Sequence, residues 1–182
     1  MLFKFRVFDF FYNFVTHKGN NFSNNFGKVM DEKIKMSAER DEKYMRQALN
    51  EAERALSKRE VPIGAVVVAG DRIIGRGHNL VETLMDATAH AEMQAITAAM
   101  SALGGKYLND CTLYVTVEPC VMCGGALAWS QIGRVVYGAA DEKRGYSTFS
   151  ERIMHPKTQV VRGVLHEECE QLMRRFFADL RK

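Results

Sequence analysis

The sequence lacks the features that would place it in a membrane or in an oxidising compartment. No stretch of about 18 apolar residues occurs in the chain, so no membrane-spanning helix is expected. Only four cysteines are present, and they imply no disulfide framework, which fits a reducing cytoplasm. The net charge of +3 is mildly basic, so an RNA partner is permitted but not required.

The rest of the composition is that of an ordinary globular protein, with 47% hydrophobic and 26% charged residues. At 182 residues the chain is long enough for one domain with a sizeable core and an additional arm. Residues 1–36 differ in composition, being rich first in Phe and then in Asn. Arg6 and Asp9 interrupt the apolar part and no small-residue cleavage site follows, which disfavours a signal peptide. We therefore expect an N-terminal arm over residues 1–36, either a genuine accessory segment or a start assigned too far upstream, and a folded domain over residues 37–182.

Hydrophobic periodicity predicts a helix and a β-hairpin at the start of this domain. Ser37 is expected to cap a helix that runs to about Lys58, because apolar residues recur there at helical spacing between charged ones. The β-branched run Ile63–Val68 predicts a buried strand, followed by a Gly-Asp turn. A second strand is expected from Arg72 to about Asn79.

The remainder of the domain alternates helices and strands. An apolar helical run opens at His90, and a helix joins two predicted strands, Cys111–Val117 and Arg134–Tyr137. A helical crossover of this kind makes the two strands parallel neighbours. A final amphipathic helix from about Glu167 to Leu180 is expected to bury three side chains, Leu172, Phe176 and Phe177. The order β-β-α-β-α-β predicts an α/β domain with helices packed on a sheet.

Two short segments contain side chains that suit a metal ion. The segment T-A-H-A-E-M contains His90 and Glu92, and the segment E-P-C-V-M-C-G-G-A contains Cys120 and Cys123. Thiolates and imidazoles are ligands that zinc prefers. Structural zinc sites usually have four protein ligands, whereas catalytic sites use three and leave the fourth position to water. Three obvious ligands and a nearby carboxylate therefore favour a catalytic zinc.

The helices expected to begin at these two segments support metal binding by the cysteines but do not by themselves place Glu92 beside His90. Pro119 suits the first position of a helix, which would put Cys120 and Cys123 in its first turn, on one face. The helix dipole at that end favours thiolates over thiols. Residues at i and i+2 do not share a face of a regular helix, so spacing alone does not bring His90 and Glu92 to one metal.

These motifs resemble a known family. The H-A-E and P-C-V-M-C segments are similar to the H-x-E…P-C-x-x-C signature of zinc-dependent nucleobase deaminases. The wider text resembles bacterial tRNA-specific adenosine deaminases in four further segments: E-V-P-I-G-A, G-H-N, L-Y-V-T-V-E-P-C and I-G-R-V-V-Y-G-A. The likeness covers roughly the last four-fifths of the chain. Ala87 and Ala140 stand where the family usually has Pro and Arg.

The resemblance implies a three-layer α-β-α, cytidine-deaminase-like fold, in which helices flank a central mixed five-stranded sheet. It also implies hydrolytic deamination of adenosine to inosine at the wobble position of a tRNA anticodon loop, with a zinc-activated water attacking C6 of adenine. The resemblance implies that Glu92 is a proton shuttle and that His90, Cys120 and Cys123 are metal ligands. It also implies that Asn79 is an amide that binds the flipped nucleotide, that Ile63 is an apolar wall against the base, and that Asp141 is a loop acid near the nucleotide backbone.

The partners implied are the anticodon stem-loop of a tRNA and a second copy of the chain in a homodimer, in the cytoplasm and without a membrane. Lys143, Arg144 and the basic C-terminal helix could contact phosphates. Other interpretations stay open for the substrate residues: Asn79 as a turn residue, Ile63 as core, and Asp141 as a solvated charge.

Three alternatives for the whole site also remain. The metal could be structural, completed by His78, His155 or Cys111. The enzyme could instead act on a small molecule, either guanine or a free cytosine nucleoside. Finally, the chain could be a non-catalytic RNA-binding module that uses zinc for folding, although such a module would have no need of Glu92.

Overall fold

The computed structural model describes the backbone of residues 21–181 and the side chains of residues 31–181. Residues 1–20, and with them much of the predicted arm, lie outside the described residues. The chain divides into two units, residues 1–40 and residues 41–182. The boundary predicted between residues 36 and 37 stays a prediction. Within the described part of the chain, no helix combines the length and apolarity needed to cross a membrane.

The second unit is built on a mixed five-stranded sheet with the strand order β2-β1-β3-β4-β5. Strand β1 pairs antiparallel with β2 and with β3, whereas β3–β4 and β4–β5 are parallel pairs. The predicted hairpin and the parallel crossover are therefore confirmed. Periodicity did not reveal β5, because a four-residue edge strand is too short to show alternation. The strands are β1 (Gly64–Ala69), β2 (Arg72–His78), β3 (Cys111–Val117), β4 (Arg134–Ala139) and β5 (Gln159–Arg162).

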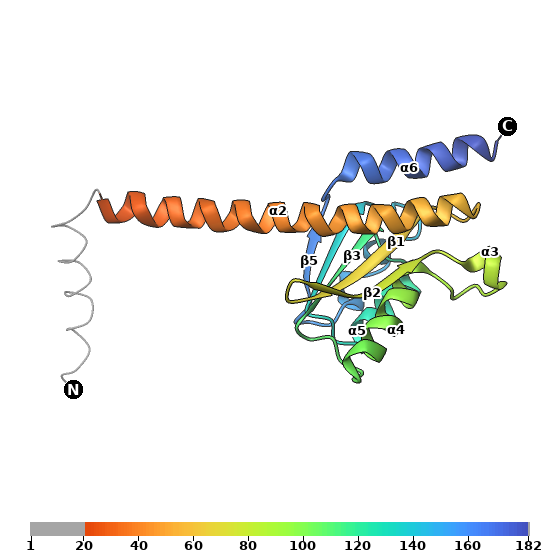
Figure 1. Cartoon of the computed structure of the whole chain (residues 1–182), viewed down its shortest axis with the longest axis horizontal. Coiled ribbons are helices and arrows are strands. Elements are labelled where there is room, and N and C mark those ends of the chain that lie inside the picture. Colours follow the sequence, from red (N-terminus) through yellow and green to blue (C-terminus); the bar gives the residue numbers. More distant parts are fainter. Residues whose placement is uncertain (1–20, 182) are drawn as a thin grey trace. The chain divides into compact units, whose positions relative to one another are not determined.

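Helices cover both faces of this sheet, which confirms the three-layer fold (Figure 1). One face packs against α4 (Ala91–Leu103) and α5 (Val121–Trp129), and its core includes Ala95, Leu127 and Val135. The other face packs against α6 (His166–Asp179) and the part of α2 that belongs to the second unit. A short helix, α3 (Val81–Leu84), follows β2, and two 3-10 turns, η1 (Tyr146–Thr148) and η2 (Glu151–Ile153), follow β4.

The predicted start of the first helix is wrong. Helix α2 spans Asn21–Ser57, so Ser37 lies inside the helix and does not cap it. No proline interrupts this segment, and an i,i+4 ion pair between Lys35 and Glu39 at 3.9 Å spans the expected cap position. A serine can occupy a solvent-facing helix position as well as a cap, and the sequence alone did not distinguish the two.

The buried stripe of the last helix is narrower than predicted. Leu172 and Phe176 are buried, whereas Phe177 is 43% exposed. Cys169, Leu172 and Phe176 follow i, i+3, i+7 spacing and are buried, and Cys169 belongs to the core on this face of the sheet. The position after Phe176 is turned about 100° around the helix axis, which takes it out of the core.

Strand β2 and helix α4 pack backbone to backbone. Ala91, Ala95 and Ala99 of α4 are fully buried. A Cβ atom at Gly77 would overlap the Ala91 carbonyl oxygen and come within 2.7 Å of the Ala95 nitrogen, and Gly75 faces Ala95 in the same way. Because small residues meet on both sides, the N-terminus of α4 is held directly against the end of β2.

Candidate metal-dependent active site

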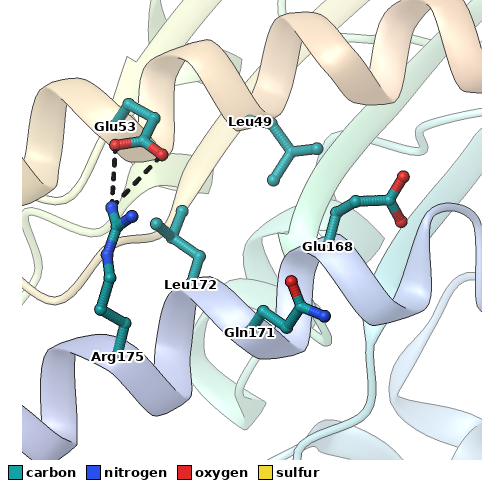
Figure 2. A pocket seen from close by; sticks show the side chains of 6 residues that line it. All are labelled: Leu49, Glu53, Glu168, Gln171, Leu172 and Arg175. Atoms are coloured by element: carbon teal, nitrogen blue, oxygen red, sulfur yellow. Dashed lines mark hydrogen bonds and ion pairs between the residues drawn. The ribbon is translucent and has the colours of Figure 1, made fainter.

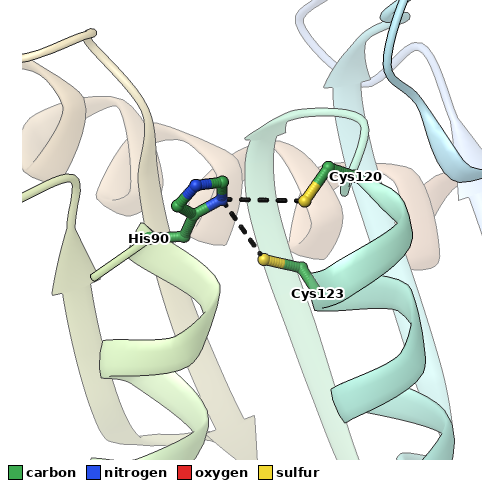
Figure 3. Close-up of side chains that lie close together, drawn as sticks. All are labelled: His90, Cys120 and Cys123. Atoms are coloured by element: carbon green, nitrogen blue, oxygen red, sulfur yellow. Dashed lines mark hydrogen bonds between the residues drawn. The ribbon is translucent and has the colours of Figure 1, made fainter. Parts of the chain in front are cut away.

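Three potential metal ligands converge at the N-termini of α4 and α5. His90 Nδ1 lies 3.7 Å from Cys120 Sγ and 3.5 Å from Cys123 Sγ, as Figure 3 shows. The three donor atoms all lie within 4.8 Å of one another. The two segments are far apart in the sequence. The antiparallel pairs β1–β2 and β1–β3 bring the ends of β2 and β3 to the same edge of the sheet, and α4 packs on β2.

The helix starts explain how these side chains converge. His90 is the N-cap of α4, with an extended backbone (φ −71°, ψ 155°), so helical spacing does not govern its direction. Cys120 is likewise the N-cap of α5, and Cys123 is the third residue of that helix. The position predicted for Pro119 is therefore wrong: it precedes the cap and is not the first helical residue. Its ring still suits the extended chain that leads from β3 into α5.

The electrostatics of the group suit a bound cation. A hydrogen bond from the Cys123 thiol, together with one from His90, lowers the pKa of Cys120 to about 4, although burial opposes this shift. The interaction with Cys120, and burial, raise the pKa of Cys123. The two shifts make Cys120 the more readily ionised of the two thiols. A soft divalent metal would stabilise both as thiolates, so two sulfurs and one imidazole fit a metal site with an open fourth position.

Glu92 lies beside this group in the first turn of α4. Its side chain is 3% exposed, and its Oε2 atom has no hydrogen-bond partner among the described residues. Burial raises the pKa of Glu92 to about 7, and the carboxyl interacts electrostatically with Cys120 and His90. A buried acid with a free oxygen and a pKa near neutrality suits proton transfer.

The alternative ligands for a structural metal lie elsewhere. His78 pairs through its two ring nitrogens with Glu51 at 3.4 Å and Lys58 at 3.1 Å. His155 Nδ1 accepts a backbone hydrogen bond, and Cys111 is buried at the start of β3. None of the three predicted alternatives belongs to the described ligand group.

Two predicted substrate residues, Asn79 and Ile63, adjoin the ligand group. The Asn79 backbone N–H donates to the Ile63 carbonyl at 3.0 Å, and the next residue, Leu80, donates to the carbonyl of Ala89, also at 3.0 Å. Ala89 directly precedes His90 in the chain. Ile63 is half-buried against the core of the α4–α5 layer.

The third predicted substrate residue, Asp141, lies on the loop after β4. Its Oδ1 atom accepts the backbone N–H groups of Lys143 and Arg144, both at 3.0 Å, which closes a tight turn. The loop is attached to the ligand segment by a bridge between Cys120 and Gly145.

Two buried carboxylates that were not predicted hold these loops. Glu118, two residues before Cys120, accepts the backbone N–H of Asp141 at 3.2 Å and that of Ser147 at 3.1 Å. On the other side of the site, Glu60 accepts hydrogen bonds from the segment that contains Asn79. In the sequence, each could have been noticed as a charged residue directly next to an apolar strand or a proline: Glu60 in E-V-P-I-G-A and Glu118 in V-E-P-C.

A separate groove lies between α2 and α6, in the layer opposite the ligand group (Figure 2). It has a volume of about 270 Å³, and the Glu53–Arg175 ion pair at 3.3 Å crosses it. Its other lining side chains are Leu49, Glu168, Gln171 and Leu172. The groove is therefore not part of the candidate active site.

Comparisons with known proteins give the class and the family of the chain. A model of the MafB19-like deaminases matches residues 39–181, so the class of this protein is a deaminase. The tRNA-specific adenosine deaminase of Bacillus subtilis is 48% identical over 147 residues, which cover 78% of this chain and 91% of that protein.

Solved structures give the same result. One from a study of A-to-I editing by tRNA deaminases at the wobble position of transfer RNA has a TM-score of 0.66 and 41% identity, covering 70% of this chain and 96% of that one. A guanine deaminase from Bacillus subtilis has a TM-score of 0.54 and 36% identity, covering 63% and 77%. The chain belongs to the family of tRNA-specific adenosine deaminases.

Proposed function

We propose that this protein converts adenosine to inosine at the wobble position of a tRNA anticodon loop, with zinc as its metal. The family membership supports the reaction and the tRNA substrate. The observation that carries the proposal is the open three-ligand group, His90, Cys120 and Cys123, next to the buried carboxyl of Glu92.

In this proposal the side chains of the site divide the chemistry between them. His90, Cys120 and Cys123 would hold the zinc ion, which would lower the pKa of a bound water molecule from ~15.7 towards ~7. Glu92 would take one proton of the attacking water and transfer it to a purine ring nitrogen. It would then take the second proton from the new hydroxyl group at C6 and transfer it to the amino group, which leaves as ammonia. Its pKa of about 7 allows it both to accept and to donate a proton near neutral pH.

The substrate is proposed to reach the site as an extruded loop nucleotide. Extruding a base from a single-stranded anticodon loop costs little free energy, because no base pair has to be broken. In this arrangement Ile63 forms an apolar wall, Asn79 hydrogen-bonds the nucleotide, and Asp141 lies near its backbone. The backbone links from Asn79 to Ile63 and from Leu80 to Ala89 support the first two roles.

We also propose that two copies of the chain form a homodimer and that the enzyme works in the cytoplasm, where its tRNA substrate would be. Apolar side chains on α5 support the dimer, since Trp129 is 86% exposed and Val121 and Met122 are also exposed. Analytical ultracentrifugation at micromolar concentration tests it, and a purely monomeric species would contradict it.

The first experiment measures inosine formation on an RNA hairpin that carries adenosine at the wobble position, alongside free adenosine, guanine and cytidine. Turnover of the hairpin alone supports the proposal. Turnover of guanine alone would contradict it and move the protein to the small-molecule deaminases, one of which shares its fold.

The matched variant is Glu92→Gln, which keeps the side-chain volume and removes the proton shuttle. We expect kcat to fall by about 10²–10⁴-fold with the bound zinc unchanged. Asp41→Asn, at a buried carboxylate in the opposite layer, is the control and should retain turnover. Equal activity of Glu92→Gln and the wild type would refute the role of Glu92.

A further inference from the structure

Glu60 is a fully buried carboxylate outside the ligand group, and its hydrogen bonds converge on one segment. It accepts from Asn79 Nδ2 at 3.1 Å, from the Glu82 backbone N–H at 3.2 Å and from the Thr83 backbone N–H at 2.7 Å. Its own backbone N–H donates to Ala55 near the end of α2 at 3.0 Å. Through its backbone and its side chain, Glu60 therefore connects the end of α2 to the segment that follows β2.

This carboxylate replaces a missing helix cap. The N-cap residue of α3, Leu80, has no side chain that can accept a hydrogen bond from the first turn. The N–H groups of Glu82 and Thr83 would otherwise lack an acceptor, and Glu60 supplies one from another part of the chain. Burial acts to raise the pKa of Glu60, but the bonds from Thr83 and Glu82 and the proximity of His78 lower it overall, so the group stays ionised at neutral pH.

An ionised carboxylate can only accept hydrogen bonds, and this fixes the orientation of the Asn79 amide. If the amide flipped, its oxygen would face the carboxylate of Glu60, and two acceptors would meet in a buried site. The Asn79 Oδ1 atom and its second N–H proton thus have a fixed direction. The bond to Glu60 is made by Nδ2 alone and does not involve Oδ1.

The backbone of the same segment is tied to the ligand group. Asn79 N–H bonds to Ile63, and Leu80 N–H bonds to the residue that precedes His90. Asn79 is buried; its backbone N–H is bonded to Ile63 and its side-chain amide to Glu60. Glu60 therefore determines which atoms of the Asn79 amide remain available to a bound molecule.

We infer that Glu60 is a positioning residue for the substrate: it locks the Asn79 amide and the first turn of α3 in the orientation that receives the nucleotide. This inference rests on the proposed function, because it takes Asn79 as a substrate contact. Glu60 itself touches neither the nucleotide nor the metal ligands in this role.

The test uses Glu60→Gln, which keeps the shape but places an N–H₂ group among three donors. Either one donor loses its acceptor or the Asn79 amide flips. We expect KM for the hairpin to rise about tenfold, as for a lost hydrogen bond to a charged group, with a much smaller change in kcat. In an Asn79→Ala background the same substitution should change KM by less than about twofold, because contacts that act together are not additive.

Two further measurements separate positioning from folding. Asp41→Asn also removes the charge of a buried carboxylate and should lower the melting temperature without raising KM. Fluorescence anisotropy of the hairpin with Glu92→Ala and with Glu92→Ala/Glu60→Gln measures binding without turnover, and the second protein should bind more weakly. If Glu60→Gln does not fold, Glu60→Asp keeps the charge and withdraws it by one methylene group.

Two results would overturn the inference. One is a rise in KM that is the same with Asn79 as with alanine at that position. The other is a lower melting temperature with KM unchanged. If the wild type deaminates guanine and not the hairpin, the proposed function fails, and the coupling of Glu60 to Asn79 is then measured on KM for guanine.

Discussion

Gly145 offers a test of how the loop after β4 is held against the ligand group. A Cβ atom at this position would lie 2.5 Å from Glu118 Cδ and 2.6 Å from the carbonyl oxygen of Asp141. Ordinary carbon contacts are ~3.5–4.0 Å, so the alanine is about 1 Å too close to both. One neighbour is backbone, and the other is a buried carboxylate with hydrogen bonds to Asp141 and Ser147.

Gly145→Ala therefore has to move the Glu118 carboxylate, the loop, or both. Overpacking of this kind costs about 1–3 kcal/mol. Because 1 kcal/mol shifts the melting temperature of a domain of this size by roughly 2–4 °C, we expect it to fall by about 2–12 °C. Because this loop is proposed to lie near the substrate, a displacement of about 1 Å can reduce kcat/KM on the order of 10²-fold.

The assay combines thermal unfolding, bound zinc and turnover of the RNA hairpin. Gly105→Ala is the matched control, since a Cβ there meets nothing within 4 Å and the backbone does not have a positive φ. It should leave all three quantities near those of the wild type. A Gly145→Ala protein with the melting temperature and kcat/KM of Gly105→Ala would refute the reasoning from this close approach.

Two further predictions concern stability. Asp41→Ala removes the acceptor of two hydrogen bonds from Arg134, at 2.7 and 2.6 Å. It should lower the free energy of unfolding, measured by urea titration, by about 2–4 kcal/mol. The reason is that the Arg134 side chain is only 23% exposed, so water replaces the lost bonds only in part. Glu53→Ala breaks the exposed pair with Arg175 and should cost at most about 1 kcal/mol; equal losses would contradict the role of burial. The pKa of Glu60 is below its ordinary value of 4.5, so its stabilising effect is complete above pH 4.5 and is lost as the pH falls through the folded-state pKa. The stability difference between the wild type and Glu60→Gln should therefore shrink on acidification below pH 4.5, and a difference that stays constant with pH would count against this account.

The arrangement of elements could be predicted because it follows from local patterns. The β-branched run that became β1 and the helical crossover between β3 and β4 are visible in sequence. The start of α2 and the exposure of Phe177 were not, because a serine or a phenylalanine fits both environments at such positions. Which environment is realised depends on packing partners that are distant in the sequence.

The site shows the same division. Ligand types and spacing indicated the metal group, but the convergence of His90 and Glu92 depends on His90 being an N-cap, which periodicity does not describe. Glu60 and Glu118 were missed because their function lies in the backbone N–H groups opposite them. Such pairings are set only when the loops are in place.

The contact between β2 and α4 has a consequence for how this enzyme could be altered. Gly77 and Gly75 contribute no side-chain atom to the site, yet their lack of one sets the height of α4 above the sheet. Because His90 caps α4, the distance between its imidazole and the two sulfurs depends on how close α4 lies to the sheet. Variation that alters the geometry of this ligand group can therefore arise at positions far from His90, Cys120 and Cys123, and a search confined to the side chains around these three would overlook it.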